Sequence, residues 1–209
     1  MKIKNTQNPL LILTIFMITI VSSSQSNKVL GGICDGCEAL LEYGNTPLSP
    51  IDTLPLFENS RQQLKITGTV YHKDKKTPAK DVILYIYHTN QAGIYPTKGN
   101  EKGWAKRHGY IRGWVKTEKN GQYTFYTFRP GAYPGRNAPE HIHITVKEPN
   151  KTEYYLDDFV FSDDPILTKE KIAKLKNRGG SGIKKPIMID GISTIHRDLI
   201  LGHNIPNYK

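Results

Sequence analysis

Residues 121–146 (GQYTFYTFRPGAYPGRNAPEHIHITV) contain the patterns that decide the fold and the chemistry of this chain. The stretch begins and ends with alternating residues, as β-strands do, and a Pro- and Gly-rich turn that carries Tyr133 lies between them. On a strand, His141 and His143 share one face, with their Cα atoms about 7 Å apart. Two imidazoles so placed can bind one metal ion, but for a His-x-His pair alone two surface histidines are the better explanation.

Neighbouring motifs weaken the explanation of His141 and His143 as two surface histidines. Residues 87–95 (YHTNQAGIY), 129–134 (RPGAYP) and 139–143 (PEHIH) resemble successive iron-binding motifs of the intradiol ring-cleavage dioxygenases. The similarity extends over residues 64–166, about half of the chain. Carried over residue by residue, it implies four ligands of ferric iron: Tyr95, Tyr133, His141 and His143.

The resemblance implies a non-haem Fe(III) enzyme that uses O2 to open a catechol-type ring between its two hydroxylated carbons. The donor set agrees, because two phenolates and two imidazoles suit a trivalent ion better than zinc. A free tyrosine has a pKa near 10, so it needs a bound cation to ionise at neutral pH. In the family the incoming diol displaces one tyrosinate, and the matching residue here is Tyr133.

Two positions depart from the family pattern. Ala138 stands where the family has an arginine in its histidine block, and Asp158 aligns with a glutamine that helps to shape the site. Such an arginine stabilises developing negative charge. We therefore expect Arg136, two residues upstream, to reach in from the loop as the catalytic cation. Arg112 and Arg129 are other candidates, for which structural salt bridges are the better explanation.

Three functions remain open at this stage. The first is a ferric intradiol dioxygenase that acts on a small aromatic diol and O2. The second is a non-catalytic relative that keeps the iron and binds a catecholate or another phenolic ligand, an alternative that Ala138 and Asp158 leave open. The third is a structural or carbohydrate-binding β-sandwich, which the four retained ligand positions argue against. Oxygen uptake with a panel of catechols separates the first two.

Residues 1–24 have the pattern of a secretory signal peptide: two early lysines, an apolar run at 9–21, and three serines. The apolar run is shorter than the roughly 20 residues of a membrane span. We therefore expect cleavage near Gln25 and an exported protein, periplasmic or extracellular, with no stable membrane span.

Cys34 and Cys37 are the only cysteines. The Cys-x-x-Cys spacing is compatible with a disulfide, half of a zinc site or a redox motif. The chain has no second cysteine pair and no βαβ pattern around this one. In an oxidising compartment, a small-loop disulfide is the most economical explanation. We expect residues 25–62 to form an N-terminal arm around it.

Residues 63–209 are predicted to form one mainly β domain, an antiparallel β-sandwich with one short helix and the extended N-terminal arm. The Asn120–Gly121 pair predicts a hairpin between two strands, and the helix is expected within residues 164–179. The predicted strands cover residues 64–71, 82–88, 110–117, 122–128, 141–147, 154–161 and 193–201.

The net charge is +10, with an excess of lysine in residues 169–185. Nucleic-acid binding is one explanation of such a run. However, it lacks interleaved aromatic residues, so the solvated face of a short helix explains it better. We expect no nucleic-acid partner, and the sequence leaves the oligomeric state open, a homo-oligomer included.

Overall fold

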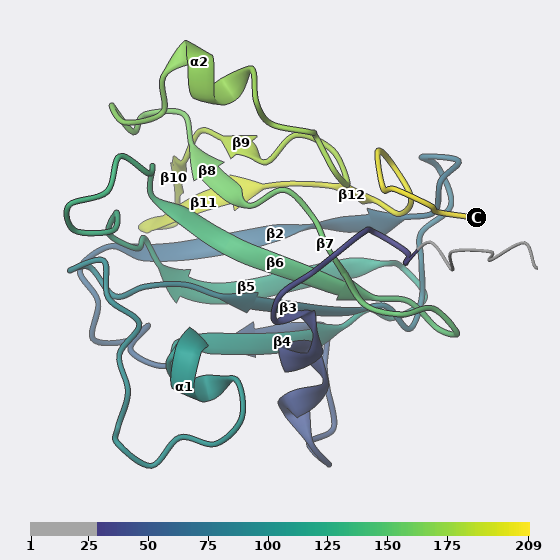
Figure 1. The fold of residues 1–209 in the computed structure, drawn as a ribbon, viewed down its shortest axis with the longest axis horizontal. Helices are drawn as coiled ribbons and strands as arrows, with labels where there is room; N and C mark the ends of the chain where they lie inside the picture. The colour runs from purple at the N-terminus through teal and green to yellow at the C-terminus, as the bar shows by residue number, and fades with distance from the viewer. Residues whose placement is uncertain (1–28) are drawn as a thin grey trace, which may run out of the picture.

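Two β-sheets packed face to face form the body of the protein in the computed structural model, which describes residues 29–209 (Figure 1). The predicted β-sandwich is therefore confirmed, whereas the expected signal peptide, residues 1–24, lies outside the described residues. The first sheet contains β1 (Ile51–Thr53), β2 (Gln63–Tyr71), β5 (Gln122–Phe128), β10 (Ile187–Ile189), β11 (Ile192–His196) and β12 (Leu199–Ile200). The second contains β3 (Ile83–Tyr87), β4 (Arg112–Lys116), β6 (His141–Lys147), β7 (Tyr154–Tyr155), β8 (Phe159–Phe161) and β9 (Ile183–Lys184).

The core lies between the two sheets and is built by the alternation of the strands. On β6, Ile142, Ile144 and Val146 are buried in this core. Because successive side chains of a strand point to opposite faces, His141 and His143 lie on the outer face of the second sheet. Each fully buried aliphatic side chain contributes about 1.5–3 kcal/mol to stability, so the register of β6 is firmly set and the two histidines are held in place by it.

The sheets are mixed and not purely antiparallel. β1 pairs with β5, both β11 and β12 pair with β2, and β8 pairs with β9, all in parallel. The part of the N-terminal arm that contains β1 thus belongs to the first sheet. The predicted last strand is broken into β11 and β12 around Arg197, which is buried.

The hairpin predicted at Asn120–Gly121 is wrong. β4 pairs with β3 in the second sheet, whereas β5 pairs with β2 in the first. The turn therefore leads from one sheet to the other. Gly121 does adopt a left-handed conformation, with φ of 69°, and its N–H donates to Glu118 O at 2.9 Å. An Asn-Gly turn fixes a local reversal but not the pairing partner, and both strands bury apolar residues in the same core.

The helix predicted in residues 164–179 is confined to α2 (Lys169–Ile172), none of whose residues is buried. Its N-terminus is capped by the Thr168 hydroxyl, which accepts from Lys171 N at 3.4 Å. Because no residue of α2 is buried, apolar packing does not extend the helix over the rest of the predicted range. Within residues 29–209, no helix is long and apolar enough to cross a membrane.

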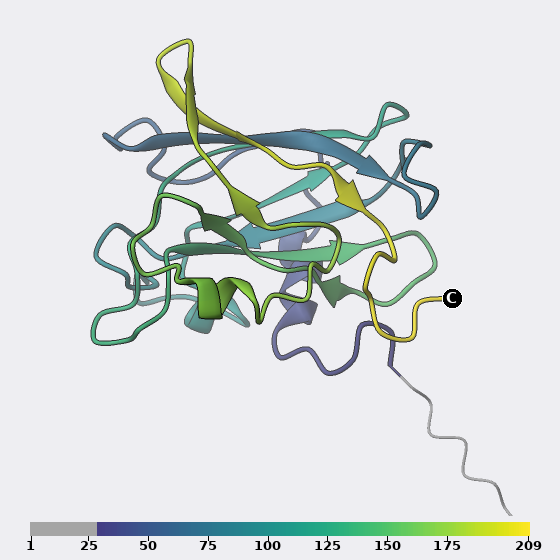
Figure 2. The same ribbon diagram turned by 90° about the horizontal axis from the view of Figure 1, so that it is seen from above.

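Two further helices were not expected, the 3-10 helix η1 (Cys37–Tyr43) and α1 (Ala105–His108). In Figure 2 they lie with α2 on the side of the second sheet that faces away from the first. η1 buries Ala39 and Leu40 against Tyr85. Just before it, the predicted Cys34–Cys37 disulfide is confirmed, and we call residues 33–37 the disulfide turn.

Candidate metal centre

The structure brings the four expected ligands to one point on the outer face of the second sheet. The phenolic oxygens of Tyr95 and Tyr133 lie 2.5 Å apart. His143 Nε2 lies 2.9 Å from the Tyr95 oxygen and 3.3 Å from the Tyr133 oxygen. His141 Nε2 lies 3.2 Å from the Tyr133 oxygen. Four donor atoms so close together, two from each residue type, can surround a single cation.

The two tyrosines reach this point from loops that pack backbone against backbone. Tyr95 follows β3, and Asn90 shapes its loop by accepting from the N–H groups of Ala92 and Ile94 with its side-chain oxygen, both at 3.0 Å. A Cβ atom at Gly93, where φ is 74°, would collide with the carbonyl of Ala132 in the Tyr133 loop. The glycine of the first motif is therefore required for the close approach of the two loops.

The hydrogen bonds of the imidazoles fix their tautomers. His141 Nδ1 lies 2.7 Å from Pro139 O. Since a carbonyl oxygen only accepts, this nitrogen carries the proton and Nε2 presents a lone pair to the cluster. His143 Nδ1 lies 3.1 Å from the Asp158 carboxylate in the same way. Metal-binding histidines characteristically donate their other N–H to a carbonyl or carboxylate, so the donor set fits an iron ion.

Burial and charge set the protonation of the cluster in the absence of a cation. Burial lowers the pKa of His141, and the neighbouring His143 lowers it further, so this imidazole is neutral and ready to bind. Burial also raises the pKa of Tyr95, assisted by its hydrogen bond to Tyr133. The pKa of Tyr133 is raised by burial as well, against the opposing charge of Arg136. Both phenols therefore need a bound cation to ionise.

Asp158 was expected only as a departure from the family pattern, and its position gives it a role. Burial acts to raise the pKa of this carboxyl, but the imidazoles of His143 and His141 outweigh burial and leave the pKa below its ordinary value. The donor atoms of His141, His143 and Asp158 lie within 4.8 Å of one another, so these three could also hold a metal ion. Because Asp158 contacts His143 at Nδ1, we assign it the orientation of that imidazole.

The arginines fall into two groups. Arg112 pairs with Glu42 at 2.5 Å, and Arg129 pairs with Glu140 at 2.5 Å and with Asp163 at 2.9 Å, which confirms the structural salt bridges. Arg136 is exposed, and its guanidinium lies 5.7 Å from the centre of the Tyr133 ring.

His88, which belongs to the first motif, is fully buried. Its Nδ1 lies 2.7 Å from Thr89 O and its Nε2 2.6 Å from the Thr127 hydroxyl.

One neighbour of the cluster gave no signal in the sequence. The ring of Tyr87 stacks on His143 with centroids 4.5 Å apart, and His108 stacks on Tyr87 at 3.7 Å. His108 Nδ1 also lies 2.9 Å from the Tyr85 hydroxyl. Tyr87 is part of the first motif, but His108 is in a short helix of a long connection, where no strand periodicity places it.

Two clefts flank the cluster, and Asp158 and Tyr155 border both. The cleft on the His141 side has a volume of about 470 Å³ and mostly apolar walls; we call it the lysine cleft, because Lys171 and Lys174 line it. The cleft on the His143 side has a volume of about 360 Å³ and is walled by the disulfide turn. We call it the disulfide cleft.

Lys169 and Lys171 lie on α2, none of whose residues is buried, but Lys171 is half-buried. Its ammonium group donates to Asn137 Oδ1 at 2.6 Å and to Ile166 O at 2.8 Å. Both acceptors are neutral, so these two contacts leave the positive charge of Lys171 in place in a cleft that the carboxylates of Asp157 and Asp158 also line.

Comparisons with known proteins point to one group of enzymes. No family model matches the chain. The protocatechuate 3,4-dioxygenase beta chain of Burkholderia cepacia is 27% identical, over 62% of this chain and 60% of its own length. This chain thus spans less than two thirds of that relative.

Among solved structures, catechol 1,2-dioxygenase from Acinetobacter sp. ADP1 gives a TM-score of 0.57 at 18% identity, over 75% of this chain and 58% of that one. The dioxygenase domain of a dioxygenase carbohydrate-binding protein fusion from Streptomyces sp. SirexAA-E gives 0.56 at 22% identity, over 75% of this chain and 90% of that one. The fold is therefore that of these dioxygenases, and the resemblance drawn from the sequence motifs is confirmed.

Proposed function

We propose that this chain is a non-haem Fe(III) dioxygenase that opens a catechol-type aromatic ring between its two hydroxylated carbons with O2. The observation that supports the proposal best is the convergence of two phenolic oxygens and two unprotonated Nε2 atoms, joined by contacts of 2.5 to 3.3 Å. The names of similar proteins, which are catechol and protocatechuate dioxygenases, support the same reaction class.

The proposed iron ligands are Tyr95, Tyr133, His141 and His143. When bound, Fe(III) would supply the positive charge that stabilises the phenolates and the ionised diol. It would also supply the electron-accepting centre that makes a ring carbon reactive toward O2. His141 and His143 are fixed by β6, so they serve as permanent anchors. Tyr133 stands on a loop with Pro130, Gly131, Pro134 and Gly135 around it. Its phenolate oxygen can therefore move aside for a diol oxygen and accept the proton of that hydroxyl group.

The diol ring is proposed to lie in the lysine cleft. His141 lines this cleft beside the apolar side chains of Leu156 and Val160, which suit the face of an aromatic ring. Arg136 is the proposed catalytic cation. Its charge acts to lower the pKa of Tyr133 against the effect of burial, and negative charge develops on the ring oxygens as the diol loses its protons.

A second candidate function is supported by two residues. At Ala138 the wall of the lysine cleft lacks the arginine that the family pattern has at this position, and Asp158 adds a negative charge beside His143. Both changes act against stabilisation of an anionic substrate. A protein that binds iron and a phenolic ligand without opening the ring would tolerate them.

Oxygen uptake by purified, iron-loaded protein with a panel of catechols tests the proposal. We expect uptake of one O2 per ring opened, and a coloured protein whose broad visible band arises from charge transfer between tyrosinate and Fe(III). A coloured protein that binds catechols without consuming O2 would support the second function instead. A colourless protein with a full complement of iron would contradict the ligand assignment itself.

We also propose that the protein is exported, either to the periplasm or out of the cell. The pattern of residues 1–24 and the Cys34–Cys37 disulfide support this location. Intact-mass measurement of the protein from a fractionated native source is the test. The expected result is a chain that begins near Gln25, found outside the cytoplasmic fraction, and an uncut chain in the cytoplasm would contradict the proposal.

A further inference from the structure

The disulfide cleft has a wall that comes from a distant part of the sequence. One side of the cleft is formed by the proposed ligand His143, its partner Asp158 and the ring of Tyr87. The other side is the disulfide turn, which contributes all five of its residues to the lining. Anything bound next to His143 on this side must therefore fit between the histidine and the turn.

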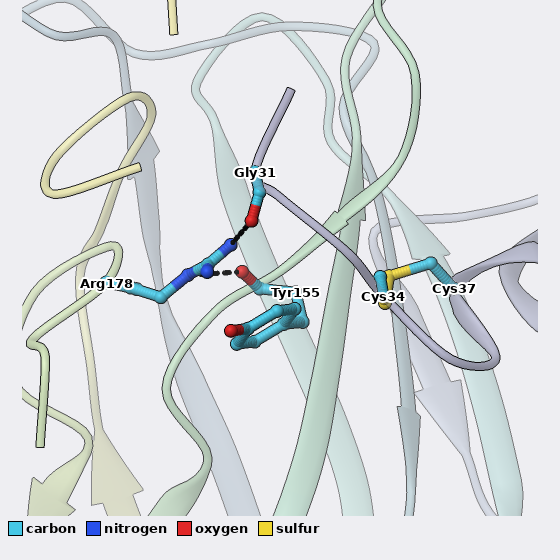
Figure 3. Close-up of a disulfide and its surroundings, with 5 residues drawn as sticks. All are labelled: Gly31, Cys34, Cys37, Tyr155 and Arg178. Carbon is cyan, nitrogen blue, oxygen red and sulfur yellow. Dashed lines mark hydrogen bonds between the residues drawn. A yellow bond between two sulfur atoms is a disulfide. The ribbon is translucent and has the colours of Figure 1, made fainter. Parts of the chain in front are cut away.

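The segment before the turn is anchored to Tyr155, which lines both clefts. Gly31 N–H donates to Pro206 O at 2.8 Å, and Arg178 Nη2 donates to Gly31 O at 2.9 Å. Arg178, which is buried, also donates through Nε to Tyr155 O at 3.1 Å, and its guanidinium lies 3.5 Å from the centre of the Tyr155 ring (Figure 3). The entry to the turn is thus tied to a residue that lines both clefts.

Two residues within the disulfide turn, and the helix after it, make further contacts. Asp35 pairs with Arg107 at 2.8 Å. Gly36 has φ of 93°, and a Cβ atom there would lie 2.9 Å from His108 Nε2, so this backbone packs directly on the aromatic stack behind His143. η1 then buries Ala39 and Leu40. The turn and both its flanks thus have contacts other than the disulfide, and a loop with a sequence separation of only three gains little stability from closure. What the disulfide adds is a fixed separation of the two ends of the turn, with the Cα atoms of Cys34 and Cys37 5.7 Å apart.

Ile33 stands out within the turn, because 94% of its surface is exposed while it lines the cleft. We propose that the disulfide turn is a specificity-determining wall of the substrate site, which limits how far a diol extends past His143 and gives apolar ring substituents a contact on Ile33. This inference rests on the proposed function, because it places the substituent of a diol, whose ring is proposed to lie in the lysine cleft, against the turn on the far side of His143. The proposed ligands are catechols with an apolar substituent. Contact between this substituent and Ile33 removes the apolar surface of both from water.

The test compares the iron-loaded parent chain with Ile33→Ser. Catechol, 4-methylcatechol and 4-tert-butylcatechol serve as substrates, with kcat and KM measured separately. We expect Ile33→Ser to raise KM for 4-tert-butylcatechol roughly 10-fold, the effect of a lost apolar contact, with kcat and the KM of catechol unchanged. The matched control is Ile187→Ser, an isoleucine that is 56% exposed on β10, which should alter none of these values.

The shape of the turn is tested by opening the disulfide. In Cys34→Ser/Cys37→Ser, discrimination between the bulky and the unsubstituted catechol should change several-fold, while iron content stays at the parent level. Reduction of the folded parent with a phosphine provides the same test without mutation. The phosphine gives two electrons to the S–S bond and takes its oxygen from water, and each sulfur gains a proton. Cys34 is half-buried, so the bond is accessible to the reagent.

These experiments distinguish a wrong assignment of the wall from a wrong proposed function. If the parent opens catechols but Ile33→Ser and the opened disulfide leave every KM ratio unchanged, the wall assignment is wrong and the proposed function stands. Dissociation constants for 4-tert-butylphenol, which is not a diol, are measured by calorimetry in parallel. If the parent opens no diol but Ile33→Ser weakens this binding roughly 10-fold, the wall assignment stands and the proposed function is wrong. Equal binding of the phenol by both chains would contradict the wall assignment in that case too.

Discussion

The lysine cleft and the disulfide cleft share Asp158 and Tyr155, yet different physical means determine their walls. The lysine cleft is bounded by apolar side chains and by α2, a helix of four residues with no buried side chain. The charge of Lys171, whose two hydrogen-bond acceptors are neutral, favours an anionic group. The disulfide cleft is bounded by a covalently closed turn whose flanks are anchored on a buried arginine and an aromatic stack. One side of the cluster is thus suited to selection by charge, and the other to selection by shape.

The largest expected effect is on the cluster between the two clefts. His143→Ala should abolish iron binding, because the imidazole is fixed on β6 and the remaining ligands cannot replace it. Tyr133→Phe should keep substantial iron but lose most turnover, because this loop residue is proposed to leave the metal when the diol binds. Elemental analysis beside oxygen uptake measures both. Parent-like turnover by Tyr133→Phe would rule out the proposed ligand exchange.

Acid should destabilise the fold through His108, which packs against the disulfide turn. Burial lowers the pKa of this histidine from 6.5 to about 4, with smaller contributions from His143 and nearby arginines. The unfolded chain therefore binds the proton first as pH falls. The contribution of neutral His108 to the free energy of unfolding is therefore fully present above about pH 6.5 and is lost progressively toward pH 4. For a pKa shift of this size, the loss is at most about 3 kcal/mol.

Urea unfolding of parent and His108→Gln between pH 7 and pH 4.5 checks this expectation. The parent should lose more stability than the variant over this range, while the buried His88, whose pKa burial also lowers to about 4, titrates in both. His72→Gln, at an exposed position, is the control and should follow the parent. Parallel pH profiles for all three proteins would show that His108 is not the group responsible.

The next effect concerns Asp158, which both clefts share. Asp158→Asn should lower the affinity for iron about 10–100-fold, the usual consequence of losing a partner that orients a metal-binding histidine. Asp157→Asn is the matched control, because the neighbouring carboxylate instead accepts from Asn177 N at 2.6 Å. Competition with an iron chelator measures both affinities. An equal loss in the two variants would assign Asp158 a role in the fold and not in the orientation of His143.

The cluster and the strands around it were predictable from sequence, whereas both cleft walls were not. A strand pattern determines which side chains share a face, so the placement of His141 beside His143 follows from their spacing alone. The disulfide turn is placed beside His143 by tertiary contacts of Gly31, Asp35 and Gly36, which leave no periodic signal. The wrong hairpin at Asn120–Gly121 has the same origin, because local turn chemistry does not specify which sheet a strand joins.

The smallest expected effect tests selection by charge in the lysine cleft. The Lys171 ammonium is held by two neutral acceptors, so one of its three N–H groups and its whole charge remain available to a ligand. Lys171→Met keeps the length and the apolar part of the side chain but removes the charge. We expect it to weaken binding of 4-hydroxybenzoate about 10-fold relative to 4-methylphenol, which corresponds to about 1.4 kcal/mol. Half-burial limits the effect to this size, because solvent screens a partly exposed charge.

Lys169→Met provides the control for Lys171→Met, since Lys169 is an exposed residue of the same short helix. Titration calorimetry with the iron-loaded chains gives the dissociation constants of both phenols for each variant and the parent. The ratio between the anionic and the neutral phenol removes any general loss of affinity from a displaced α2, because that loss affects both ligands. If Lys171→Met and Lys169→Met changed this ratio equally, the charge of Lys171 would act from a distance and not by contact with the ligand. The two clefts would then differ in shape but not in selection by charge.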